Sequence, residues 1–179
     1  MQTIPGVLSK AAQTWPDRPA LIDGDQRYSF ATLDEAVDGA ARAMCAAGLE
    51  KGDRFAIWAP NIADWVIAAL AGQRVGGVLV TVNTRFKGAE AADLLRRSEA
   101  RFLFTVTDFL GVDYPELLEG EALPDLERTI VMRGPASGAE SFEHFLSQGE
   151  AVSSEELSKR AEAVTGDDIA DIIFTSGTT

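Results

Sequence analysis

Short apolar runs alternate with segments of helical spacing through the middle of this 179-residue chain. The apolar runs are residues 55–59, 78–82 and 102–106. In residues 61–75 and 88–99, which separate them, apolar side chains recur at the spacing of one helical face. Strands and helices that alternate with short links are typical of right-handed βαβ units around a parallel sheet. The pattern therefore predicts an α/β fold.

The first 50 residues have the signals of a helix, a hairpin and a second helix. Residues 4–15 and 33–44 have helical spacing. Between them, Asp23-Gly24-Asp25-Gln26 fits a hairpin turn that joins residues 20–23 to residues 27–30. We therefore expect an antiparallel hairpin between two helices.

After residue 106 the chain becomes acidic and irregular as far as residue 127. One further strand is expected at residues 129–132, then a short helix at 141–148 and a polar stretch, helical or linking, at 153–164. At 179 residues the chain is long enough for one ordinary domain and too short for two. The predicted divisions are residues 1–106 with the hairpin and βαβ units, residues 107–164 as an acidic connecting region, and residues 165–179 as a strand that enters a loop.

Polar and aromatic residues near the first βαβ unit allow further predictions. Asn61 and Asp64 suit a capping arrangement at the start of the helix that runs to Val75. Trp58 and Trp65 are core candidates, because large aromatic side chains on a strand and a helix are usually buried. The alternative for both tryptophans is the lining of a substrate tunnel.

The charge of the chain excludes one class of function. The formal net charge is -12 and the pI is near 4.5, with acidic residues spread over the whole length. Such a surface repels nucleic acid and anionic lipid. With 46% hydrophobic and 25% charged residues, the composition is that of a globular protein. We therefore expect no nucleic-acid partner.

The single cysteine, Cys45, lies within a helical pattern, so no intrachain disulfide can form. We interpret Cys45 as a small apolar helix residue, and the only histidine, His144, as a half-exposed helix residue. The N-terminus lacks the pattern of a signal peptide, and no apolar stretch reaches the ~20 residues of a membrane span. A cytoplasmic location without a transmembrane segment is expected.

The last residues form an apolar run that ends in hydroxyl groups around one glycine. In Thr175-Ser176-Gly177-Thr178-Thr179, glycine lets the backbone approach an anion, and amides and hydroxyls could donate to phosphate oxygens. A hydroxyl-rich turn after a strand is the alternative interpretation. The GxxxxGK[ST] phosphate loop does not occur in the sequence, so a Walker-type NTPase is not supported.

The surrounding sequence resembles one family. Residues 166–179, GDDIADIIFTSGTT, resemble the phosphate-binding motif of adenylate-forming enzymes, which comprise acyl-CoA synthetases, adenylation domains and luciferases. Residues 28–33, 52–61 and 71–86 resemble further motifs of that family in the same order. The resemblance covers nearly the whole chain, and residues 107–158 are its least diagnostic part.

Details of these motifs point to a branch of the family. Thr32 stands where an acidic residue is usual, and Thr81 stands where proline is common. The ending Asn83-Thr84-Arg85 resembles the acyl-CoA synthetase branch. Together with residues 57–61, IWAPN, it most resembles bacterial ligases for fatty acids or steroid-derived acids. In the family the phosphate motif continues with Gly-x-Pro-Lys-Gly, and this sequence stops before those residues. The resemblance implies a partial N-terminal domain, residues 1–179, of a longer enzyme.

The resemblance implies an enzyme that activates a small-molecule carboxylic acid with ATP and Mg²⁺ and transfers the acyl group to coenzyme A. On this basis Thr175, Ser176, Gly177, Thr178 and Thr179 form the first half of the phosphate loop. The resemblance assigns no catalytic or metal-binding residue to residues 1–179 and places them in the remainder of the enzyme. We expect these 179 residues alone to be inactive.

Two other functions and the oligomeric state are left open by the sequence. The acyl group could pass to a carrier protein instead of coenzyme A. The chain could also be a non-catalytic α/β module that binds a nucleotide or a partner, which would require the apolar residues 169–174 to be covered. Asn83 and Arg85 could reach a functional surface or could simply shape a turn between strand and helix.

Overall fold

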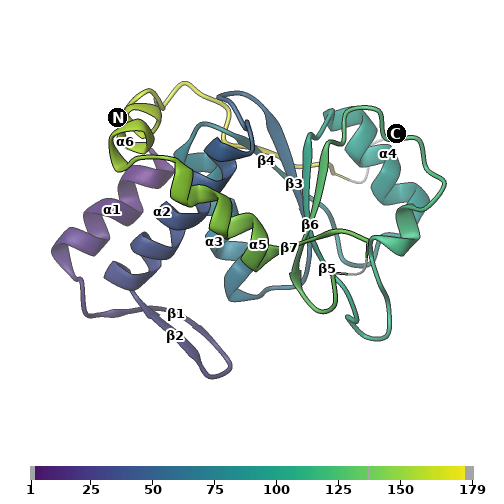
Figure 1. Cartoon of the computed structure of the whole chain (residues 1–179), viewed down its shortest axis with the longest axis horizontal. Coiled ribbons are helices and arrows are strands. Elements are labelled where there is room, and N and C mark those ends of the chain that lie inside the picture. Colours follow the sequence, from purple (N-terminus) through teal and green to yellow (C-terminus); the bar gives the residue numbers. More distant parts are fainter. Residues whose placement is uncertain (1–2, 137, 176–179) are drawn as a thin grey trace.

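The computed structural model describes residues 3–136 and 138–175. Within these ranges, six strands form one parallel sheet in the order β7-β6-β5-β3-β4-β8 (Figure 1). The predicted α/β class is confirmed. The strands are β3 (Arg54–Trp58), β4 (Val78–Thr81), β5 (Phe102–Val106), β6 (Arg128–Arg133), β7 (Glu140–Ser141) and β8 (Asp171–Ile172).

Helices cover both faces of this sheet. Helices α2, α3 and α5 lie over one face, α1 and α6 pack against α2, and α4 lies over the opposite face (Figure 1). Because both faces are covered, the central strand β5 is buried at every position. The helices are α1 (Ile4–Thr14), α2 (Phe30–Ala46), α3 (Ala63–Arg74), α4 (Gly88–Ser98), α5 (Phe142–Ser147) and α6 (Ser154–Glu162), with short 3₁₀ turns η1 (Glu116–Leu118) and η2 (Gln148–Ala151).

The close approach of α3 to the sheet depends on one glycine. A Cβ atom at Gly72 would lie 2.2 Å from Cζ of Phe55, so a larger residue cannot occupy this position without movement. The ring of Phe55 in turn meets Phe104 of β5 edge to face, with centroids 6.3 Å apart. Gly72 therefore brings α3 into direct contact with the aromatic core.

The predicted hairpin is confirmed, and it leads directly into α2. Strands β1 (Pro19–Asp23) and β2 (Gln26–Ser29) pair antiparallel, and Gly24 in the turn has a φ of 57°. Ser29 caps α2: its Oγ accepts from the Thr32 amide, and Thr32 Oγ1 accepts from the Ser29 amide at 2.9 Å. Thr32, which differs from the residue usual in the motif, thus closes the capping box.

The predicted cap of α3 is wrong. Ile62 occupies the N-cap position and offers no side-chain acceptor, and neither Asn61 nor Asp64 caps the helix. Instead Oδ2 of Asp23, at the end of β1, accepts from the Ala63 amide at 3.0 Å. The hairpin thus supplies from a distance the acceptor that a local N-cap residue would normally provide.

The predictions for the second half of the chain are largely confirmed. The strand expected at residues 129–132 is β6, and the expected short helix is α5. Of the two interpretations of residues 153–164, the helical one is confirmed, since α6 lies there. Strand β7, which pairs with β6, was not predicted because it has two polar residues and no apolar pattern. The final strand was predicted over residues 169–174 and is shorter, since only Asp171 and Ile172 pair with β4.

No helix in the described part of the chain is both long and apolar enough to cross a lipid bilayer.

Candidate functional site

The candidate site lies at the carboxyl edge of the sheet. Because β3, β4, β5 and β8 are parallel, their carboxyl ends meet at one edge. Ligands of open α/β sheets bind outside this edge. The site is therefore formed by the segments that follow the strands, which are residues 83–87 after β4, residues 107–114 after β5 and residues 173–175 after β8.

The segment after β4 is a tight turn organised by Asn83. Its Oδ1 accepts from the Arg85 amide at 2.9 Å, and its backbone oxygen accepts from the Phe86 amide at 3.0 Å. A third bond fixes the turn to the sheet, because Nε1 of Trp58 donates to the same Asn83 oxygen at 3.1 Å. Asn83 thus shapes the turn, as one of the two sequence interpretations has it, and Arg85 lies exposed on the turn surface.

An aromatic pair holds this turn against the segment after β5. The rings of Trp58 and Tyr114 are stacked, with centroids 4.4 Å apart and an interplanar angle of 3°. Tyr114 also donates its hydroxyl to the backbone oxygen of Thr84 at 3.1 Å. Both rings are buried, and burial raises the pKa of Tyr114. Trp58 is therefore a core residue, and Trp65 on α3 is half-buried.

A surface cleft of about 380 Å³ lies between the turn and the segment after β5. Arg85 and Lys87 line one side, and Phe109 and the exposed Leu110 line the other. Two cationic side chains thus stand at a cleft in a protein of net charge -12. Sequence reasoning singled out Arg85 and missed Lys87 and Tyr114; the irregular residues 107–127 have no pattern that could place Tyr114.

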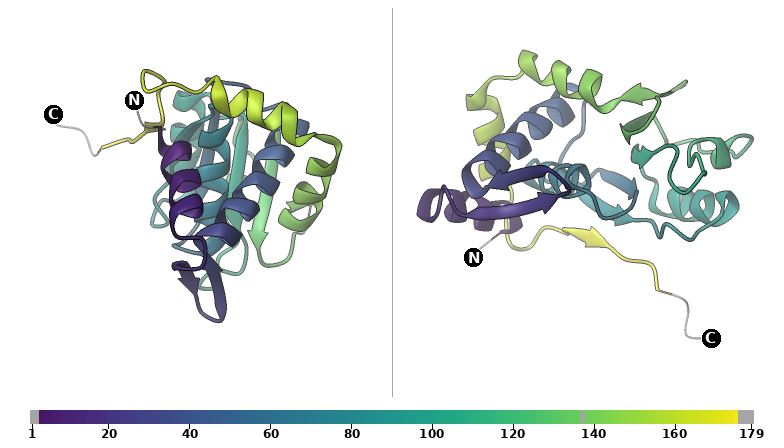
Figure 2. Two further views of the ribbon diagram at one scale, coloured as in Figure 1. Left: turned by 90° about the vertical axis from the view of Figure 1, so that its left-hand side faces the viewer. Right: turned by 90° about the horizontal axis from the view of Figure 1, so that it is seen from below.

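The phosphate-loop prediction falls mainly outside the described residues. Of the five residues assigned to it, only Thr175 is described, and it is exposed just beyond β8. Ser176, Gly177, Thr178 and Thr179 lie outside the described residues, so their assignment stays a prediction. Strand β8 runs along β4 at the outer edge of the sheet (Figure 2) and directs Thr175 toward the carboxyl edge.

Two other candidates for chemistry, Cys45 and His144, do not line this cleft. Cys45 is buried in α2 and burial raises its pKa, which agrees with its interpretation as an apolar helix residue. His144 is more exposed than expected and lies 3.8 Å from Glu140. Within residues 3–136 and 138–175, no group of three His, Cys, Asp or Glu residues could hold a metal ion.

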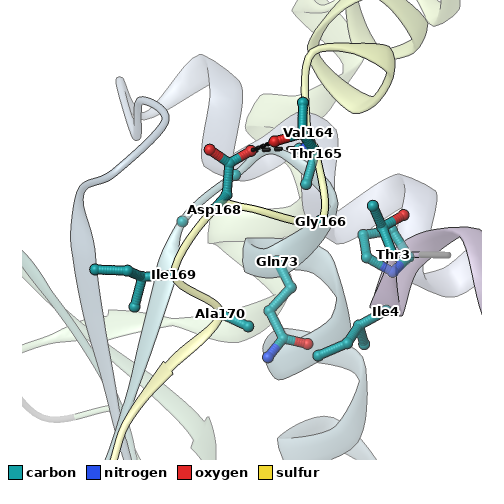
Figure 3. Close-up of a pocket in the computed structure, with 12 residues that line it drawn as sticks. Thr3, Ile4, Gln73, Val164, Thr165, Gly166, Asp168, Ile169 and Ala170 are labelled. Carbon is teal, nitrogen blue, oxygen red and sulfur yellow. Dashed lines mark hydrogen bonds between the residues drawn. The ribbon is translucent and has the colours of Figure 1, made fainter. Parts of the chain in front are cut away.

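A second hollow lies at the opposite, amino edge of the sheet. It measures about 120 Å³ and is bounded by the start of α1, the end of α3 and residues 164–170 (Figure 3). Gly77, just before β4, and Ala170, just before β8, both line it. The hollow is therefore separated from the candidate site by the length of the strands.

The parallel α/β sheet, and the strand that leads into a hydroxyl-rich segment, agree with the resemblance to adenylate-forming enzymes. Residues 8–179 match the family model described as AMP-binding enzyme. The chain belongs to this family. The resemblance found in the sequence is thereby confirmed.

Two curated relatives are named as ligases of one acid with CoA. The chain is 41% identical to "3-[(3aS,4S,7aS)-7a-methyl-1,5-dioxo-octahydro-1H-inden-4-yl]propanoyl:CoA ligase" of Mycobacterium tuberculosis, over 100% of this chain and 35% of the relative. It is 37% identical to the protein of the same name from Rhodococcus jostii, over 99% of this chain and 36% of the relative. The chain thus spans about a third of the length of these relatives, and their names fit the predicted branch.

A solved structure supports the fold. The coronafacic acid ligase of Pectobacterium brasiliense superposes with a TM-score of 0.82 and 19% identity, covering 97% of this chain and 33% of that one. Similarity at this level shows that the two share the fold.

The stand-alone module is not favoured. That interpretation required residues 169–174 to be covered, but Ile169 is 66% exposed and Ile173 is 70% exposed. Within the described residues β8 pairs only with β4. Together with the family match, the exposed apolar side chains count against an independent binding module.

Proposed function

We propose that residues 1–179 form the N-terminal part of an acyl-CoA ligase. In the proposed reaction, the carboxylate oxygen of an acid attacks the α-phosphorus of ATP and displaces pyrophosphate. The thiolate of coenzyme A then attacks the acyl carbon and displaces AMP. The observation that carries the proposal is β8, which lies parallel to β4 and leads into Thr175 and the hydroxyl-rich residues that follow.

The residues after β8 are proposed to bind the β- and γ-phosphates of ATP. Their amides and hydroxyls are donors, and Gly177 would let the backbone approach the phosphate oxygens. Magnesium, when bound, would neutralise part of the phosphate charge.

The cleft beside Arg85 and Lys87 is proposed to bind the phosphates of coenzyme A. It lies after β4 and β5, whereas the residues proposed to hold ATP follow β8. Cationic side chains at a cleft raise the local concentration of an anionic ligand. The names of the relatives support coenzyme A, rather than a carrier protein, as the acyl acceptor.

For the acid, we propose a fused-ring propanoic acid of the kind printed in the names of the two relatives. A fatty acid is the second candidate within the same branch. We also propose a cytoplasmic location, because the single cysteine is buried as a free thiol, which suits a reducing compartment.

The test begins with the intact mass of the purified protein under denaturing conditions, followed by ATP–pyrophosphate exchange with a panel of ring-bearing and fatty acids. A longer ligase that carries residues 1–179 should catalyse exchange and then form the CoA thioester. Residues 1–179 alone, at 19.2 kDa, should catalyse neither step. Exchange by the pure 19.2 kDa chain, or none by the longer protein with any acid, would contradict the proposal.

A further inference from the structure

Strand β8 is held in place by few backbone contacts. Its register with β4 rests on two pairs, Leu79 with Asp171 and Val80 with Ile172. One further bond joins the Leu79 amide to the oxygen of Ala170 at 2.9 Å. A ladder of this length specifies register weakly unless side chains add to it.

The apolar pattern of β8 does not fully supply that specification. In most strands the register is set because one face must be buried. Here Ile173 is largely exposed on one face, while Ile172 and Phe174, on the other, pack against the core and remain half-buried. Apolar burial therefore specifies the register only in part.

Gln73 of α3 provides a polar contact that does depend on register. Its side chain is buried, with 7% of the residue exposed, and Nε2 donates to Oδ1 of Asp171 at 2.8 Å. In Figure 3 the amide of Gln73 points toward the segment that contains Ala170. A buried amide without a partner is unfavourable, so this bond favours the one register that places Asp171 opposite Gln73.

The position of Gln73 is itself fixed relative to β4. Three residues connect α3 to β4, and the Gly77 amide donates to the oxygen of Gly72 at 2.8 Å. Gly76, in the middle of this connection, has a φ of 85°, which favours glycine. The bond from Gln73 to Asp171 therefore fixes β8 relative to β4.

A second contact acts on the opposite face of the strand. The guanidinium of Arg97, on α4, lies over the ring of Phe174 at 4.9 Å from its centroid. Arg97 is also 3.6 Å from Asp93, one turn earlier on the same helix. Before the strand, Lys51 pairs with Asp168 at 2.8 Å. The segment is therefore held from both faces of the sheet and at its entry.

We propose that Gln73 and Arg97 are positioning residues that hold the phosphate-loop strand in register with β4. This inference rests on the proposed function. A slip of two residues would keep the side chains on their faces but move Thr175 by about 6.6 Å along the strand. A slip of one residue would turn Asp171 away from Gln73. Either shift would displace Thr175, and with it the residues proposed to bind ATP, along the edge of the sheet.

The test exchanges the carboxylate and the amide side chains between positions 171 and 73. Gln73→Glu places a second carboxylate beside Asp171, whereas Q73E/D171N restores a donor and an acceptor in reversed order. In the longer ligase, Q73E should raise KM for ATP about tenfold and leave KM for the acid unchanged, and the double variant should recover to within about twofold. Asp171→Asn alone retains an acceptor for Gln73 and should behave like the wild type.

Gln148→Glu is the matched control, because Gln148 also bonds a carboxylate, that of Glu140, at the other end of the sheet. Gln148→Glu is expected to lower the free energy of unfolding and to leave KM for ATP unchanged. An effect on KM for ATP in Q148E equal to that in Q73E, or no recovery in Q73E/D171N, would overturn the positioning role.

A readout that does not need activity separates this inference from the proposed function. Hydrogen exchange of the Leu79 amide, which donates to Ala170, should be faster in Q73E than in the wild type and should slow again in the double variant. If the wild-type ligase showed no ATP–pyrophosphate exchange with any acid, the proposed function would fail. The hydrogen-exchange rate of the Leu79 amide would still test whether Gln73 sets the register of β8. Unchanged protection of Leu79 in Q73E would overturn the inference.

Discussion

The indole of Trp58 and the ring of Tyr114 are parallel to within 3° and 4.4 Å apart, which joins the end of β3 to the segment after β5. Each ring also bonds the turn after β4, through Asn83 and Thr84 respectively. The cleft at the candidate site is therefore supported from beneath by one aromatic pair.

Variants of Tyr114 should separate the stacking from the hydrogen bond. Tyr114→Phe keeps the ring and loses the bond to Thr84, so the free energy of unfolding should fall by about 1 kcal/mol. Tyr114→Ala also removes the buried ring and should lower it by about 3 to 5 kcal/mol. Urea denaturation measures both values. Equal losses in the two variants would mean that the stacked ring adds nothing.

Charge reversal at the cleft should affect only the second half of the proposed reaction. In R85E/K87E, KM for coenzyme A should rise about tenfold or more, while ATP–pyrophosphate exchange in the absence of coenzyme A should stay within about twofold of the wild type. The double variant K10E/R27E, which reverses two exposed charges away from the cleft, controls for the same change in net charge. A loss of pyrophosphate exchange in R85E/K87E would instead place ATP in the cleft.

The link between Asp23 and α3 should make stability depend on acid pH. The Ala63 amide, and then Arg133 at 2.6 Å, hold the pKa of Asp23 below its ordinary value of 3.8. Since the folded pKa is the lower one, this stabilisation is complete above the unfolded value and is lost as the pH falls through the folded value. Asp23→Asn keeps an acceptor but cannot ionise, so its free energy of unfolding should fall less steeply between about pH 5 and about pH 2. If the free energy of unfolding fell equally steeply with acid in the wild type and in Asp23→Asn, Asp23 would not be the source of this pH dependence.

Two glycine substitutions should have opposite effects. Gly72→Ala would force a Cβ atom against Phe55, and overpacking of this kind lowers the free energy of unfolding by about 1 to 3 kcal/mol. Gly39→Ala, in α2, meets nothing within 4 Å and should raise it by about 0.5 to 1 kcal/mol. Thermal denaturation of both variants measures these changes. If Gly72→Ala left the stability unchanged, α3 would be able to shift away from β3.

Much of the fold could be predicted because the pattern of apolar residues reflects burial on the sheet. Strands β3, β4 and β5 are buried along nearly their whole length, so each is visible as an apolar run. Strand β7 has no such run, because its two polar residues are only half-buried at the edge of the sheet. The final strand was predicted too long, because its apolar run includes Ile169 and Ile173, whose side chains are largely exposed.

The site was predicted less completely, because its contacts join distant parts of the chain. Asn83 could be recognised as a turn residue, since the bond it makes is with Arg85, two positions away. The bond from Asp23 to Ala63 and the stacking of Tyr114 on Trp58 join residues that no local pattern relates. Gln73 was missed for the same reason, since its partner Asp171 is 98 positions away.

The close contact between Gly72 and Phe55 also constrains how this part of the protein can diverge. The two positions share one volume, so a mutation that enlarges one destabilises the fold less when the other becomes smaller. Among family members, a residue larger than glycine at position 72 should be accompanied by a side chain smaller than phenylalanine at position 55. A chimera that exchanges helix α3 or strand β3 alone with a distant relative should therefore lose stability wherever the residues at these two positions no longer fit together.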